Sequence, residues 1–128
     1  MPPEMTPESL RVAADERGAV FEPIDDALLA AQHNCHIVVS APGAVRGNHV
    51  HRAATETTAV TGPCEVRWRS QGQIHQVEVP AGQVWRFVFA PGVSHAFRGL
   101  GPTPWVIASF STQPHDPARP DVTRDVLM

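Results

Sequence analysis

The chain has 128 residues, of which 42% are hydrophobic and 18% charged, and its formal net charge is −3. This is enough chain for one domain with a packed core. The absence of a long basic run argues against nucleic acid as the main partner. Two cysteines make no disulfide framework, and no leader peptide or membrane-length apolar run is present, so we expect a cytoplasmic protein without membrane contact.

The first residues are polar and contain several prolines. We expect residues 1–17 to form a mobile N-terminal arm or a short helical start. Residues 18–22 have the composition of a first short strand. One or two helical turns are predicted over residues 24–32, because Asp25 and Asp26 stand where acidic side chains suit the helix dipole.

From residue 35 onward the pattern is that of short strands separated by glycine and proline. The expected strands cover residues 35–40, 55–61, 64–69, 73–79, 84–89, 94–98 and 105–111. Strict alternation places Cys64, Val66 and Trp68 on one inner face, and Gln71-Gly72 is typical of a tight hairpin. We therefore predict an all-β sandwich or barrel over residues 18–111. The tail, residues 112–128, is too rich in proline for a barrel strand and is expected to wrap the outside.

The stretch from Gly43 to Gly62 contains the clearest chemical pattern. His49 and His51 are two residues apart, so on a strand both imidazoles point to one face. Glu56 follows after a short bend, where its carboxylate can return to the same point. Imidazole and carboxylate together suit zinc, iron, manganese, cobalt or nickel. A second stretch, Pro91-Gly92-Val93-Ser94-His95, opens a later strand and offers a fourth ligand.

These two stretches resemble the two motifs of the cupin superfamily. The first reads Gly43, five residues, His49-x-His51, four residues, Glu56, five residues, Gly62; the second ends at His95. The resemblance covers about residues 36–111. It implies a double-stranded β-helix, that is, a jelly-roll barrel, and one divalent metal ion held by His49, His51, Glu56 and His95. Zinc is the first expectation for the metal, with iron, manganese and nickel as alternatives.

Several other side chains are candidates for a site. Phe87 and Phe97 are expected to line the barrel, and with Trp85 they form our predicted substrate-binding wall; for Trp85 a core or interface role is the alternative. Arg46 is either an anion clamp near the barrel mouth or a solvated turn charge. We interpret Cys35 as a small core residue.

Three further histidines receive no ligand role. His36 takes the strand face opposite that of Cys35, and no second cluster lies near it at zinc-site spacing. His75 is interpreted as a residue of a sheet face. His115 is expected to be solvated in the tail.

The segment 46–51 and the tail segment 116–121 are similar to small cupins of sugar-nucleotide metabolism and to the cupin domains of capsule-sugar epimerases. This resemblance implies an isomerase, epimerase or cyclase that acts on a ketone-bearing small molecule of carbohydrate or secondary-metabolite biosynthesis, with His49, His51 and Arg46 as catalytic residues. An iron-dependent dioxygenase and a non-catalytic small-molecule-binding cupin remain alternatives. We also predict a homodimer, because small barrels leave sheet edges exposed.

Overall fold

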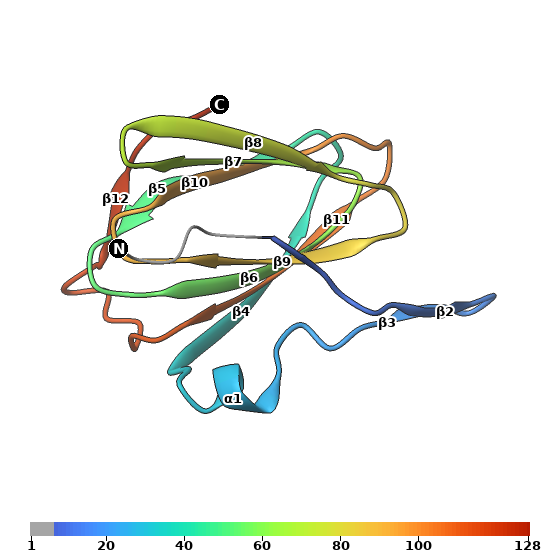
Figure 1. Cartoon of the computed structure of the whole chain (residues 1–128), viewed down its shortest axis with the longest axis horizontal. Coiled ribbons are helices and arrows are strands. Elements are labelled where there is room, and N and C mark those ends of the chain that lie inside the picture. The colour runs from blue at the N-terminus through green and yellow to red at the C-terminus, as the bar shows by residue number, and fades with distance from the viewer. Residues whose placement is uncertain (1–6) are drawn as a thin grey trace.

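The computed structural model describes residues 7–128 and consists of two five-stranded antiparallel sheets packed face to face (Figure 1). In the first sheet the strand order is β1-β9-β6-β11-β4, and in the second it is β12-β5-β10-β7-β8. The elements are β1 (Glu8–Ser9), β2 (Ala13–Asp15), β3 (Gly18–Val20), α1 (Asp26–Leu29), β4 (Asn34–Ser40), β5 (Val45–His51), β6 (Glu56–Thr61), β7 (Cys64–Ser70), β8 (Gln73–Val79), β9 (Val84–Phe89), β10 (Ser94–Gly99), β11 (Trp105–Ser111) and β12 (Val122–Arg124). The predicted all-β jelly-roll class is confirmed.

The core lies between the two sheets and follows from the alternation of the strands. Val66 and Trp68 of β7 meet Phe87 and Phe89 of β9 in one buried cluster, to which Phe97 of β10 also belongs. Each of these side chains points inward because residues two apart on a strand share a face. The predicted hairpin at Gln71-Gly72 has the positive φ angles that a tight antiparallel turn needs.

The segment that precedes β4 covers the outer face of the first sheet. Leu10, Val12, Phe21 and Ile24 pack on a second cluster that includes Phe110 of β11. Figure 1 shows this segment running beneath the first sheet, with α1 next to β4 and the β2–β3 hairpin extending away from the barrel. The expected strand over residues 18–22 is therefore present as β3, but it pairs only with β2.

The tail contributes a strand, contrary to our expectation. β12 pairs antiparallel with the edge of β5, aligning Val122 with His51 and Arg124 with His49. Its prolines lie before residue 122, so the ladder of β12 loses no amide donor. The last residues then cross the outer face of the second sheet, where Asn48 binds the backbone of Leu127 and Met128.

Of the remaining expectations, one is confirmed, one is corrected, and one lies partly outside the described residues. The one or two helical turns expected over residues 24–32 are present as a single turn, Asp26–Leu29, capped by the Asp25 side chain. Cys35 is exposed, because it lies on the outer face of β4 opposite Phe110. Of the expected arm 1–17, residues 1–6 lie outside the described part, and the remainder forms β1 and β2.

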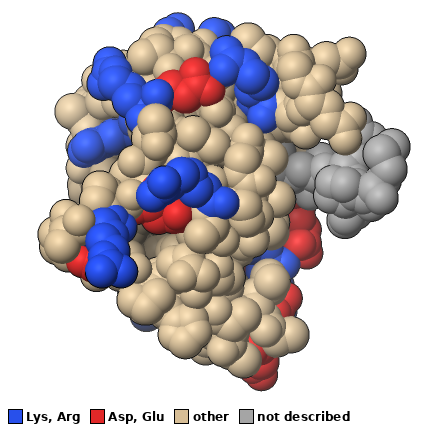
Figure 2. Space-filling view, turned by 90° about the vertical axis from the view of Figure 1, so that its left-hand side faces the viewer, with Lys and Arg blue, Asp and Glu red and all other residues tan. Residues whose placement is uncertain are grey.

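Within residues 7–128, no helix is long and apolar enough to cross a membrane. The arginines of β7 form ion pairs with carboxylates: Arg67 with Glu65, and Arg69 with Asp125. Figure 2 shows arginine and carboxylate side chains next to one another on the side of the molecule that lies to the left in Figure 1.

Candidate metal centre

A β-bulge in β5 positions the first two histidines. His49 aligns with His95 of β10 and Gly47 with Ala96, so Asn48 is an extra residue in the ladder. Gly47 and Asn48 both have positive φ, at 82° and 57°. A Cβ on Gly47 would stand 2.8 Å from the His95 carbonyl oxygen, so only glycine lets the two strands meet at this point.

Neighbouring strands bring the other two groups to the same place. His95 on β10 is fully buried, and the Phe89 ring stacks on its imidazole with centroids 4.0 Å apart. Glu56 begins β6 in the opposite sheet, where it pairs with Phe89 and Ser111. The site therefore lies between the two sheets, with its residues drawn from three strands.

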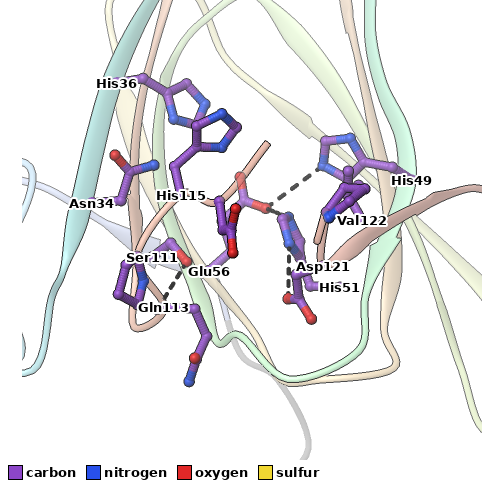
Figure 3. A pocket seen from close by; sticks show the side chains of 13 residues that line it. Asn34, His36, His49, His51, Glu56, Ser111, Gln113, His115, Asp121 and Val122 are labelled. Atoms are coloured by element: carbon purple, nitrogen blue, oxygen red, sulfur yellow. Dashed lines mark hydrogen bonds and ion pairs between the residues drawn. The ribbon is translucent and has the colours of Figure 1, made fainter. Parts of the chain in front are cut away.

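The four predicted ligand residues converge, each offering one donor atom, and these atoms lie within 4.8 Å of one another. Glu56 Oε2 is 2.7 Å from His51 Nε2, 2.9 Å from His95 Nε2 and 3.6 Å from His49 Nε2. His49 Nε2 and His95 Nε2 are 3.1 Å apart. The same nitrogen type of all three rings thus faces one carboxylate oxygen, and Figure 3 shows His49 and His51 directed at Glu56.

Hydrogen bonds on the far side of the ligands fix this orientation. His95 Nδ1 lies 3.1 Å from the Val93 carbonyl, which can only accept, so Nδ1 donates to that carbonyl and Nε2 is the nitrogen directed at Glu56. His51 Nδ1 lies 3.5 Å from Asp121 Oδ2. The hydroxyls of Thr58 and Ser109 donate to Glu56 Oε1, which leaves Oε2 for the histidines. Outer partners of this kind are what metal-ligating histidines and carboxylates require.

The electrostatics of the cluster favour a cation. Burial alone would raise the pKa of Glu56, but hydrogen bonds from His49, His51 and His95 outweigh it and hold that pKa well below its ordinary value. The hydrogen bond to Glu56 raises the pKa of His51, against the effect of burial, and the charges of Glu56 and Asp121 add to it. A buried carboxylate surrounded by three imidazoles fits a divalent ion of the zinc, iron, manganese or nickel type.

The cluster opens into a cavity of about 430 Å³. Its walls come from β4, from the ligand strands and from the segment after β11. The lining residues are Asn34, His36, His49, His51, Glu56, Ser111, Gln113, Pro114, His115, Asp116, Pro120, Asp121 and Val122. None of them is an arginine, and the chain has no lysine.

The structure does not bring the other predicted site residues to this cavity. Arg46 lies five residues before His51 on β5, its Nε donates to Ser40 Oγ, and it is not among the residues that line the cavity. Phe87 and Phe97 are buried in the core, and Trp85 packs against the same cluster. The aromatic wall we predicted is thus part of the packing between the sheets.

Sequence reasoning missed several residues that line the cavity. Asp121 accepts hydrogen bonds from the amides of Ala53 and Ala54 at 2.8 and 3.0 Å, and so holds the loop that connects His51 to Glu56. His36 lies on the inner face of β4, the face opposite Cys35, so the alternation of that strand could have revealed it. His115 belongs to the tail and carries no sequence signal of its position.

Two antiparallel sheets forming a jelly roll, with a three-histidine, one-carboxylate cluster between them, define a cupin. The profile of the family described as "Polysaccharide biosynthesis C-terminal domain" matches residues 13–123, and the chain belongs to that family. None of the curated proteins compared with the chain matches it.

Solved structures share the fold at low sequence identity. The capsular polysaccharide assembling protein CapF from Staphylococcus aureus is 24% identical with a TM-score of 0.68, and the match covers 92% of this chain but 33% of CapF. A dTDP sugar isomerase from Desulfovibrio desulfuricans G20 is 20% identical with a TM-score of 0.73, over 97% of this chain and 85% of that one.

The sugar 3,4-ketoisomerase QdtA from Thermoanaerobacterium thermosaccharolyticum, solved in complex with TDP, is 16% identical with a TM-score of 0.70, over 98% and 90% of the two chains. The chain therefore spans about a third of CapF and most of the length of the two isomerases.

Proposed function

We propose that the protein is a metal-dependent isomerase or epimerase that acts on a ketone-bearing sugar nucleotide or related metabolite in polysaccharide biosynthesis. The observation that carries the proposal is the convergence of His49, His51, His95 and Glu56 beside a cavity that, within residues 7–128, is lined by no arginine or lysine. The family assignment and the shared fold with sugar isomerases support this class of substrate.

The cation-free cavity matters because this chemistry develops negative charge. Removing a proton next to a ketone places charge on the carbonyl oxygen, which must be stabilised by a positive or polar group. When bound, a divalent ion would supply that charge as a Lewis acid. The four side chains would hold it, while Asp121, Thr58 and Ser109 keep two of the ligands in their orientation.

The test is metal content together with turnover. Protein purified without chelator should contain one divalent ion per chain, and His51→Ala should lose it. His75→Ala is the matched control, because His75 stacks on Trp68 and lies outside the ligand cluster. A wild-type protein that cannot be loaded with any divalent metal, or His51→Ala with full metal content, contradicts the proposal. Redox-active iron with consumption of oxygen would redirect the assignment to a dioxygenase.

We also propose that two copies associate through β4. This strand is an edge of the first sheet, and its outer face presents Ile37 and Val39, which are 60% and 67% exposed. An edge strand of this kind can pair with its own symmetry mate about a two-fold axis. The outer face of β9 carries two valines. Val84 is covered by the N-terminal segment, whereas Val88 stays exposed. Sedimentation that shows only a monomer at micromolar concentrations would rule the dimer out.

A further inference from the structure

The ligand cluster leaves the proposed reaction without a proton carrier among its own histidines. His49, His51 and His95 all direct Nε2 to the common point, and His95 Nδ1 is bonded to a carbonyl. A nitrogen that ligates a metal shares its lone pair and cannot also accept a proton. Another group in the cavity must therefore perform the acid–base step.

Four titratable side chains line the cavity besides the ligands: His36, His115, Asp116 and Asp121. Both oxygens of Asp121 are engaged by backbone amides, and Oδ2 also faces His51. Asp116 accepts the amide of Ala118 at 3.0 Å. Among residues 7–128, no hydrogen bond or ion pair engages a ring nitrogen of His36 or His115.

These two histidines are held by different parts of the chain. His36 lies on β4, where its position is set by pairing with Ser109 of β11, the residue whose hydroxyl donates to Glu56. His115 follows β11 in the segment that closes the cavity. Figure 3 shows both rings directed into the cavity, on the other side of Glu56 from His49.

We propose that His36 and His115 are the acid–base residues of this site, one accepting and one donating the proton; this rests on the proposed function. In the step, a neutral imidazole nitrogen takes the proton from the carbon next to a ketone. The electron pair of the broken C–H bond forms the carbon–carbon double bond, and the carbonyl oxygen takes the negative charge. Reprotonation at carbon by an imidazolium reverses this, so protons and electrons balance without an oxidant.

The types of acid–base side chain present in the sequence support the assignment. The chain has no tyrosine and no lysine, so phenol and amine acids are absent from it. Imidazole is the remaining side chain suited to carry protons at neutral pH. The substrate class that follows is a ketone with an exchangeable hydrogen on the neighbouring carbon.

Hydrogen exchange with solvent tests the assignment directly. Metal-loaded wild type is incubated in D₂O with a panel of dTDP- and UDP-linked 4-keto sugars, and deuterium uptake is followed by mass spectrometry. His36→Gln and His115→Gln should each slow uptake by about 10²-fold or more, and the double variant should reach background. His33→Gln is the matched control, since this exposed histidine lies just before β4 and does not line the cavity.

Metal content and pH profile separate catalysis from structure. Both variants should keep the wild-type metal content and circular dichroism, and the imidazole limb should disappear from the pH profile of kcat/KM in the affected variant. A double variant that exchanges within twofold of wild type overturns the assignment while the proposed function stands. A variant that loses its metal also overturns it, because the residue then supports the ligands. A wild type that exchanges no hydrogen with any of these ketones overturns the proposed function itself.

Discussion

The two ends of the chain each cover the outer face of one sheet, and they differ in how they relate to the cavity. The N-terminal segment, residues 7–24, packs apolar side chains on the first sheet and lies away from the cavity. The C-terminal segment, residues 112–128, is held on the second sheet by hydrogen bonds and ion pairs, and it also lines the cavity.

The first cover contributes to the stability of the barrel, whereas the second cover also positions residues of the site. The first cover combines apolar packing with the β1–β9 ladder and the Glu8–Arg86 ion pair, and none of its residues lines the cavity. It therefore stabilises the barrel without positioning the ligand residues. Hydrogen bonds are directional, and those of Asp121 end on the loop between His51 and Glu56. We therefore expect changes in the first cover to alter the free energy of unfolding alone, and changes in the second to alter metal affinity as well.

The largest expected effect is on stability. Phe21→Ala should lower the free energy of unfolding by about 2–3 kcal/mol, below the usual range for a fully buried phenylalanine because Phe21 is only half-buried. Metal affinity should stay at the wild-type value. Denaturant unfolding and a chelator competition titration measure the two quantities. A parallel loss of metal affinity would remove the distinction between the two covers.

Asn48 should show a smaller effect on stability, through its contacts with the second cover. Its side chain accepts from the amides of Leu127 and Met128 and donates to the Met128 carbonyl, so Asn48→Gly should cost about 1–2 kcal/mol. Asn48→Ala should cost more than Asn48→Gly, because φ is 57° at this position and a left-handed conformation is less costly for glycine than for alanine. Hydrogen exchange of residues 122–128 should rise in both variants; unchanged exchange would contradict this account of how the tail is held.

Asp121 should act mainly on the ligands. Asp121→Ala removes the acceptor for two loop amides and the partner of His51 Nδ1, and we expect about a tenfold loss of metal affinity. Asp116→Ala is the control, because Asp116 lines the same cavity without contacting the ligand loop. Equal affinities of the two variants would show that the tail does not position the site.

The smallest effect is a pH dependence of the second cover. The hydrogen bond from Ser94 lowers the pKa of Asp125, against the effect of burial, and the hydrogen bond and charge of Arg69 lower it further. A lowered carboxyl pKa gives stability that is present above the unfolded value of about 3.9 and lost as pH falls through the folded value. The loss should be under about 1 kcal/mol, because the pair is partly exposed. Unfolding measured between pH 3 and pH 6 should show it, and Asp125→Asn should abolish it.

The strands and the ligand set were predictable because they depend on local order. Alternation sets the face of each residue, and the spacing of His49 and His51 places two imidazoles on one side. The fourth ligand residue, His95, was predictable because the Pro91-Gly92 turn that precedes it is visible in the sequence. These features need no knowledge of which strands lie side by side.

The rest depends on contacts between distant parts of the chain. Asp121 and His115 reach the cavity only because the tail returns along β5. The bulge at Asn48 shifts the register of β5 against β10, which no alternation reveals. Phe87 and Phe97 were assigned to a substrate wall because alternation shows that a side chain points inward but not how far along the barrel it lies.

The pairing of β12 with β5 has a consequence for how the protein folds. The ladder joins residue 51 to residue 122, so the strand that carries His49 and His51 gains its outer neighbour only when the long segment between these residues closes into a loop. Closing a long segment is entropically costly, and such contacts form late in folding. The ligand strand is therefore an open edge in any species that lacks the tail. In a partly folded or newly synthesised chain, His49 and His51 would therefore lie on β5 before Asp121 and β12 fix their orientation.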